Sequence, residues 1–212
     1  LLLGGAAGAL LAAVSGAFLL RYSGFTFLML TVAVAQIAQN LAGKWRDLTG
    51  GDDGLSGFAV GPLLGRFDFD LEGKVASLYA LVVLAIGMYI ARRLVDSPFG
   101  LALRGIHQNR ARMAALGTPV PARLLAMYTA AGAMAGVAGA LSAQTNAIVG
   151  LDSLGFALSA ESLVMLVLGG AGTLVGALGG AAVFTLLHHT AASINPYHWL
   201  FVVGAALMGV VL

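Results

Sequence analysis

The chain contains the uncharged run Leu1–Leu20, LLLGGAAGALLAAVSGAFLL, and this run decides the fold class. A helix needs about 20 mostly apolar residues to cross the hydrocarbon core of a membrane. The run meets that requirement, and the basic residue Arg21 ends it. Because it has neither the basic start nor the clear cleavage site of a signal peptide, we expect a membrane-spanning helix.

The composition of the whole chain supports this expectation. Of the 212 residues, 59% are hydrophobic and 9% are charged, whereas an ordinary soluble domain carries roughly 25% charged residues. A compact soluble domain of this length could not cover so much apolar surface. Soluble enzymes, nucleic-acid-binding domains and disordered chains are therefore excluded, and the absence of cysteine excludes disulfides and thiolate chemistry.

Further apolar segments follow the first run. They cover residues 23–43, 75–91, 124–146, 158–190 and 199–212. Together with the first run they predict an all-α, polytopic transmembrane helical bundle of about six spans. Both ends of the chain lie inside apolar runs, so we expect residues 1–212 to be a single transmembrane domain and a fragment of a longer chain.

One apolar segment is too long for a single straight span. A continuous helix over residues 158–190 would be roughly 50 Å long, whereas the hydrocarbon core is about 30 Å thick. Gly169, Gly170 and Gly172 predict a break, which gives a short helix near 158–168 and a longer one near 173–190. The number of crossings in this segment remains open, because a re-entrant break would change it.

The charges of two loops predict how the chain is oriented. Residues 92–123 contain arginine at 92, 93, 104, 110, 112 and 123 and one acid, Asp96, whereas residues 44–74 contain more acidic than basic residues. Lysine and arginine are enriched in cytoplasmic loops. We therefore expect 92–123 and Arg21 on the cytoplasmic side, and 44–74 and 147–157 outside.

The basic loop contains the signals of a short amphipathic helix. Ser97 before Pro98 indicates a helix start, and Gly117 indicates its stop. Apolar residues are available for burial, and basic residues are available for a partner or for lipid headgroups: Leu101, Leu103, Ile106, Met113 and Leu116, then Arg104, His107, Arg110 and Arg112. On charge alone, an ordinary cytoplasmic loop would also account for this segment.

The order of residues in this loop resembles the coupling segment of ABC importer permeases, specifically the branched-chain amino-acid permease family of the LivM type. The matching residues are Ser97, Pro98, Gly100, Ala102, Arg104, Ile106, Asn109, Ala114, Leu116 and Gly117. Gly105 departs from the pattern, which has alanine there. Two further blocks resemble the family in the same order, LTGGDDGL at residues 48–55 and LGGAGTLVG at residues 168–176.

The resemblance implies a multi-pass permease subunit of an ATP-driven importer in the bacterial inner membrane. Such a subunit moves branched-chain or related small amino acids inward, with urea or amides as family-level alternatives. Its partners would be the lipid bilayer, a second permease subunit, cytosolic ABC ATPases and a periplasmic or extracytoplasmic solute-binding protein. The chain would be no enzyme and would bind no cofactor, because ATP would be hydrolysed on the ATPase subunits.

The resemblance also assigns residues 92–123 to ATPase coupling. The residues concerned are Ser97, Pro98, Gly100, Arg104, Asn109, Arg110, Ala114 and Gly117. Gly100 would allow close approach to the ATPase, and Arg104 and Arg110 would pair with acids there. The alternative function is a stand-alone secondary transporter or channel for a small polar solute. Inverted repeats or buried ionisable residues would favour it, and the sequence shows neither.

Three amide side chains lie on one face of the predicted helix 23–43. Gln36, Gln39 and Asn40 are spaced i, i+3, i+4, which places them on one face. Amides are costly in lipid, so this face must contact protein or a water-filled path. Two interpretations remain, interhelical hydrogen bonds worth about 0.6 kcal/mol each or the translocation path. Gln144, at the end of the segment 124–146, is interpreted as interfacial.

A glycine-rich turn follows that helix on the outside. It contains Gly50, Gly51, Asp52, Asp53 and Gly54. Glycine permits turns with positive φ, and aspartate favours turns. We interpret the segment as an external gate or a contact with the solute-binding protein, and a plain exposed turn is the alternative. Two adjacent acids are too few for a calcium loop.

Glu161 is the only acid in the segment 158–190. An acid within a membrane segment is a candidate for the translocation path. Glu161 also fits a helix N-terminal residue that the helix dipole stabilises, and both interpretations remain open. No metal site is expected, because the adjacent His188 and His189 point to different faces of a helix.

Two glycine stripes predict close helix packing. Gly172, Gly176 and Gly180 recur every four residues, as do Gly132, Gly136 and Ala140. Small residues at this spacing allow helix backbones to approach closely in membranes. We interpret Gly169 and Gly170 in the same way. The chain contains no GxxxxGK[ST] motif, so it is not expected to bind a nucleotide.

Overall fold

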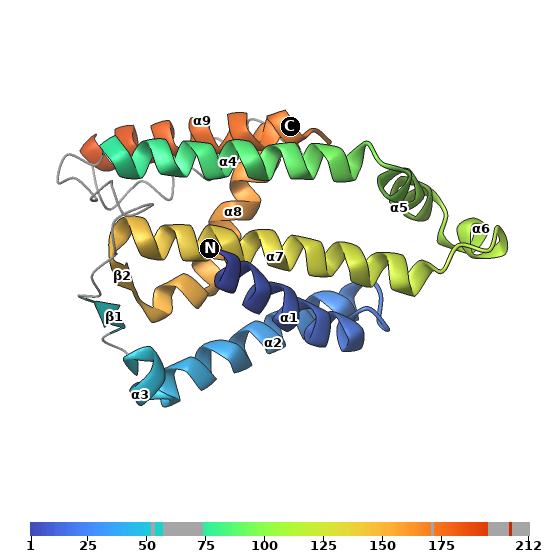
Figure 1. Cartoon of the computed structure of the whole chain (residues 1–212), viewed down its shortest axis with the longest axis horizontal. Helices are drawn as coiled ribbons and strands as arrows, with labels where there is room; N and C mark the ends of the chain where they lie inside the picture. Colours follow the sequence, from blue (N-terminus) through green and yellow to red (C-terminus); the bar gives the residue numbers. More distant parts are fainter. Residues whose placement is uncertain (52–53, 57–73, 171, 195–203, 205–212) are drawn as a thin grey trace. The chain divides into compact units, whose positions relative to one another are not determined.

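The computed structural model describes residues 1–51, 54–56, 74–170, 172–194 and 204 (Figure 1). The chain divides into two compact units, Leu1–Leu154 and Gly155–Leu212. Each unit is described by itself.

The first unit is built from helices. Its helices are α1 (Leu2–Leu19), α2 (Phe25–Lys44), α3 (Arg46–Thr49), α4 (Lys74–Val95), α5 (Pro98–Gln108), α6 (Arg110–Ala115) and α7 (Val120–Asn146). Two short strands, β1 (Leu55–Ser56) and β2 (Ile148–Val149), and the 3-10 helix η2 (Leu151–Leu154) complete it. The second unit contains α8 (Phe156–Gly169) and α9 (Leu174–Ile194).

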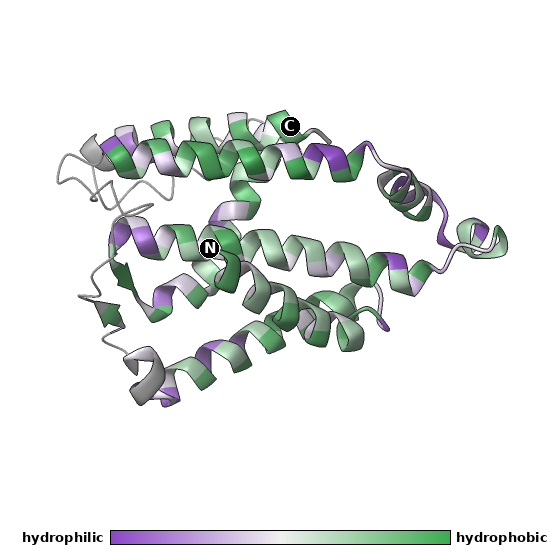
Figure 2. Ribbon diagram, in the orientation of Figure 1, coloured by the Kyte–Doolittle hydropathy of each residue, from purple (hydrophilic) through white to green (hydrophobic). Residues whose placement is uncertain are grey.

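The long helices have the length and composition of membrane spans. Among the described residues, α1, α2, α4 and α7 qualify singly, and α8 with α9 qualifies as a bent pair, which gives four or five spans. Figure 2 shows apolar residues along these helices and hydrophilic residues gathered near their ends. The predicted all-α, polytopic fold is confirmed. The expected span over 199–212 lies outside the described residues.

Helices α1 and α7 pack against each other along a glycine interface. A methyl group added at Gly8 would lie 2.9 Å from the Gly136 Cα and closer still to the Gly132 carbonyl oxygen. A methyl group added at Gly4 would lie 2.6 Å from the Ala140 Cβ. Any larger side chain would therefore force the backbones apart, so the close approach requires glycine on both helices.

The same contacts show that α1 and α7 are antiparallel. Gly4 lies against Ala140 near the end of α7, whereas Gly16 lies against Tyr128, whose ring would be 2.6 Å from an added Cβ. Leu19, at the end of α1, is 1% exposed. Arg21 and Arg123 consequently lie at the same end of the pair, as the charge pattern predicts for the cytoplasmic side.

The opposite end of this unit contains the two strands. β1 pairs with β2 in antiparallel register, with Leu55 opposite Val149 and Ser56 opposite Ile148. A Cβ added at Gly43, near the end of α2, would lie 3.5 Å from the Leu151 side chain. The loops after α2 and after α7 therefore meet on one side, in agreement with the expectation that both are outside.

The helices around the basic loop differ from the predicted boundaries. α4 continues through Arg92 and Arg93 to Val95, and α7 begins at Val120 rather than at 124. The prediction of a single amphipathic helix between Ser97 and Gly117 is wrong in one respect. The segment forms two helices, α5 and α6, because Asn109 adopts an extended conformation with φ −156° and ψ 99°.

The second unit confirms the predicted break. α8 ends at Gly169 and α9 begins at Leu174, and the two helices are bent by 114°. The Gly169 Cα would lie 2.8 Å from a Cβ at Gly180. Gly170 has φ 85°, a left-handed conformation that favours glycine, so the sharp turn between the helices depends on it.

The α1–α7 contact gives a direct prediction with a matched control on one helix. Gly136→Leu would place a side chain against the Gly4 carbonyl and the Gly8 Cα, whereas an atom added at Gly139 has nothing of the described chain within 4 Å. Both substitutions change helix propensity and hydrophobicity equally. We expect Gly136→Leu to destabilise the purified protein by about 1–3 kcal/mol more than Gly139→Leu, measured by thermal unfolding in detergent. Equal unfolding temperatures of the two variants would contradict the interface.

Candidate functional site

The starts of α5 and α6, the two helices of the basic loop, are fixed by side-chain caps. The Ser97 hydroxyl accepts a hydrogen bond from the Gly100 backbone N–H at 3.3 Å and donates one to the Leu94 carbonyl at 2.6 Å. Pro98 occupies the first turn of α5. The Asn109 side-chain oxygen accepts a hydrogen bond from the Arg112 N–H at 2.9 Å and starts α6. Capping of this kind contributes about 1 kcal/mol per helix.

Gly100 packs inside the chain. It is buried, and an added Cβ would meet the Val95 carbonyl oxygen and lie 2.7 Å from the Leu94 carbonyl oxygen. Within the described chain, the close approach that Gly100 allows is therefore to the end of α4, and the expected approach to an ATPase surface stays a prediction. A substitution here would disturb the fold before it disturbed any partner.

Besides α4, helix α5 also packs against α7 and α6. The Arg123 guanidinium of α7 stands over the Phe99 ring at 5.4 Å from its centroid. Ile106 is buried at 6% exposure, and Gly105 lies against the Met113 side chain of α6. These contacts make α5 and α6 a braced unit on the ends of α4 and α7.

The outer surface of this braced unit combines apolar and cationic side chains. Leu101 is 61% exposed and Leu116 is 72% exposed, so these two of the apolar residues available for burial are not buried in the described structure. Arg110, Arg112 and Ala114 are also exposed. We call the set of exposed side chains Leu101, Arg110, Arg112, Ala114 and Leu116 the outer face of α5–α6.

The nearby acid Asp96 has a cation of its own chain as neighbour. Its carboxylate lies 3.8 Å from the Arg92 Nε, and both side chains are largely exposed. An exposed pair of this kind contributes little to stability. The outer face of α5–α6 itself carries arginines and no acid, so its charge is unbalanced.

The glycine-rich turn on the opposite side is held in place by its own chain. The Thr49 hydroxyl donates to the Ala42 carbonyl at 2.6 Å, and the Gly51 N–H donates to that hydroxyl at 3.3 Å. Gly54 has φ 68°, and an added Cβ would lie 3.0 Å from the Gly150 Cα. Gly50 also has positive φ, 75°. Asp52 and Asp53 lie outside the described residues.

The amide face of α2 is uncovered in the described part of the chain. Gln36 and Asn40 are exposed, and Gln39 is half-buried. The Asn40 amide donates to the Gln36 main-chain carbonyl at 2.8 Å, within the same helix. Among the described residues neither glutamine makes a hydrogen bond to another helix, so the face is available to a further segment, a partner or water.

The sequence does not predict one hydrogen bond that joins α4 and α7. The Tyr79 hydroxyl donates to the Gln144 side-chain oxygen at 3.0 Å in a partly buried position. The sequence predicts Gln144 to be interfacial because it lies at the end of the segment 124–146. No local pattern indicates this pair, since only the folded arrangement brings the outer ends of the helices together.

In the second unit the expected residues fall into separate groups. Glu161 is half-buried and lies in the second turn of α8, beyond the first turn to which the dipole effect is confined. Gly176 packs on the Gly169 carbonyl, and the Gly176 N–H donates to the Thr173 hydroxyl at 3.1 Å. A Cβ added at Gly172 would have no described atom within 4 Å, so among the described residues Gly172 takes no part in this packing.

The described residues show no grouping for metal chemistry. Within them, no three histidine, aspartate or glutamate side chains gather closely enough to hold a metal ion. The candidate sites are therefore surfaces and helix faces. They lie at the two ends of the first unit, on α2 and within the α8–α9 pair.

Comparisons with known proteins all point to one family. The family described as "Branched-chain amino acid transport system / permease component" matches residues 1–211. The chain is 26% identical to the "High-affinity branched-chain amino acid transport system permease protein LivM" of Escherichia coli (strain K12), over 94% of this chain and 53% of that protein.

A second relative shows the same partial coverage. The protein of the same name from Salmonella typhimurium is 26% identical over 89% of this chain and 49% of its own length. The chain thus spans about half the length of these curated relatives. No solved structure matches it. The match over nearly the whole sequence shows that the chain belongs to the permease-component family of branched-chain amino acid transport systems.

Proposed function

We propose that the chain is the membrane-spanning part of a permease subunit in an ATP-driven importer for branched-chain or related small amino acids. The family match carries this proposal, and the names of the two relatives support the substrate class. In this account the protein lies in the bacterial inner membrane and pairs with a second permease subunit. ATP is hydrolysed on separate cytosolic ATPases.

The outer face of α5–α6 is the proposed contact with an ATPase. Two observations support this. Its exposed leucines and unbalanced arginines are the side chains that a partly acidic protein surface would cover. The braced unit is also fixed to two spans through Gly100 and Arg123. A movement of the partner would therefore reach α4 and α7 without being absorbed locally.

The opposite side of the first unit is the proposed contact with a solute-binding protein. The strand pair and the fixed turn around Thr49 and Gly54 form a shaped surface there. From this side the substrate would enter a path along the amide face of α2. A path of this kind needs polar groups that contact the solute and water, and Gln36 and Asn40 are exposed.

Reconstitution of the full-length protein tests the importer assignment. We expect uptake of labelled leucine into vesicles only when the second permease, the ATPases and ATP are present.

The variant Arg110→Gln with Leu116→Ser removes one charge and one apolar side chain from the outer face of α5–α6. We expect it to weaken ATPase association by about tenfold, which corresponds to the loss of one substantial contact.

A matched control separates docking from general charge. Arg21→Gln with Tyr22→Ser removes a charge and an exposed apolar ring at the same end of the unit but away from α5–α6. We expect this variant to bind the ATPases as the natural protein does. Equal loss in both variants contradicts the assigned docking face, and ATP-independent uptake by the isolated protein contradicts the importer.

The amide face of α2 gives a second prediction, which decides between its two interpretations. Gln36→Leu with Gln39→Leu should reduce leucine uptake by about tenfold if the face lines the path, because two solute contacts are lost. The unfolding temperature should then change little. Thr31→Val on the same helix is the control, since its hydroxyl bonds only to the Leu28 carbonyl. A lower unfolding temperature with unchanged uptake per folded molecule would assign the amides to helix packing.

A further inference from the structure

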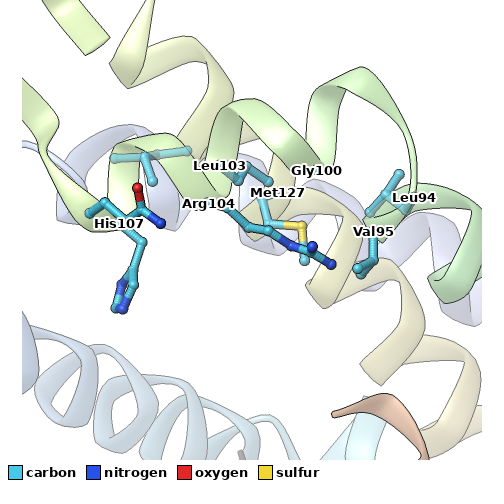
Figure 3. Close-up of a pocket in the computed structure, with 9 residues that line it drawn as sticks. Leu94, Val95, Gly100, Leu103, Arg104, His107 and Met127 are labelled. Carbon is cyan, nitrogen blue, oxygen red and sulfur yellow. The ribbon is translucent and has the colours of Figure 1, made fainter. Parts of the chain in front are cut away.

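A pocket of about 500 Å³ opens between the end of α4, the helix α5 and the start of α7 (Figure 3). Its apolar part includes the half-buried side chains Leu103, Leu124 and Met127. Its polar part consists of the exposed side chains Arg104, His107 and Gln108. The pocket therefore combines an apolar floor with a cationic and hydrogen-bonding rim.

The rim residues share one face of α5, and the exposed Leu101 lies at the edge of this face without lining the pocket. Gly100, Leu103, Arg104, His107 and Gln108 all line the pocket, and their spacing of three and four residues places them on one helix face. Gly100 on this face is buried against α4. The rim consequently faces the ends of the spans, whereas Arg110, Arg112 and Leu116 do not line the pocket.

The pocket carries positive charge without a counterion from the described part of the chain. None of the described residues that line it is acidic. Arg104 forms no ion pair with any described residue, and the nearest acid in the sequence, Asp96, lies beside Arg92. In Figure 3 the Arg104 side chain extends alongside Met127 towards Val95, and the His107 ring points away from α5 into open space. An anion would complete this arrangement.

The location of the pocket indicates the kind of anion. α4 and α7 are membrane spans, and the pocket lies where both of them meet the cytoplasmic loop. Figure 1 shows α5 nearly end-on while α4 and α7 run across the view, so α5 lies across the ends of the spans. The ends of membrane spans lie close to the lipid phosphates and the first carbons of the acyl chains. Basic pockets between span ends on the cytoplasmic side suit anionic lipid headgroups.

We propose that this pocket binds one anionic phospholipid of the cytoplasmic leaflet. The phosphate accepts hydrogen bonds from the Arg104 guanidinium and a His107 ring N–H, and Gln108 binds the polar headgroup. The upper part of one acyl chain lies against Leu103, Leu124 and Met127. The lipid thereby joins α4, α5 and α7 at their cytoplasmic ends and supports the braced unit from the membrane side.

Native mass spectrometry of the purified full-length protein tests this proposal. The probes are phosphatidylglycerol and phosphatidylcholine with identical acyl chains, and glycerol phosphate as a soluble headgroup. We expect the natural protein to retain one phosphatidylglycerol and to bind the other two at least about tenfold more weakly, because the site needs both a headgroup with a net negative charge and an acyl chain.

Two pairs of substitutions locate the site. Arg104→Gln with His107→Gln should reduce phosphatidylglycerol retention by about tenfold or more. Arg110→Gln with Arg112→Gln also removes cationic groups from α5–α6, but its residues lie outside the pocket, so retention should persist. Leu103→Trp fills the apolar floor and should abolish retention while the charges remain. Circular dichroism checks that each variant keeps its helices.

Four results would overturn the proposal. Equal loss in the two arginine variants would show general attraction to the basic loop. Equal retention of phosphatidylcholine and phosphatidylglycerol would remove the role of the charged rim, and binding of glycerol phosphate as tight as that of the lipid would remove the role of the apolar floor. Loss of ATPase association without loss of lipid in Arg104→Gln with His107→Gln would assign this face to the ATPase.

Discussion

The close glycine contact between α1 and α7 is the constraint on which the first unit depends. Gly4, Gly8, Gly132 and Gly136 let the two backbones touch, and a single added methyl group at any of them would collide with the partner helix. Lipid is as apolar as leucine, so burial of apolar surface gives little drive for helix association in a membrane. Backbone approach and dispersion contacts must supply it instead, which explains why small residues occupy this interface and leucine occupies the exposed surfaces.

The antiparallel direction of that contact places the remaining elements. The end of α7 at Val120 carries α5 and α6, which Gly100 and Arg123 fix in position. The other end carries the β1–β2 pair and the turn at Gly54. One pair of helices thus separates a cationic surface from a turn-rich surface by the length of a span. The proposed importer needs this separation, because its ATPases and its solute-binding protein lie on opposite sides of the membrane.

Much of this arrangement could be predicted from the sequence, because lipid imposes simple rules. Apolar length predicted α1, α2, α4 and α7, and the glycines at 169 and 170 predicted the break before α9. What depended on distant contacts could not be predicted. The extended conformation of Asn109 divides α5 from α6, Gly100 packs on α4, and Tyr79 meets Gln144 across 65 residues. In each case the local pattern admits several partners, and only the packed helices select one.

The sidedness of the first unit is the central claim, and the absence of cysteine from the chain makes it directly measurable. Single cysteines at Leu116, on α5–α6, and at Ser153, beside the strand pair, can be labelled with a membrane-impermeant maleimide in intact cells and in inside-out vesicles. Both natural residues are exposed. The account predicts that Leu116→Cys is labelled only in inside-out vesicles and Ser153→Cys only in intact cells. Labelling of both positions from one side, or with the sides exchanged, would contradict it.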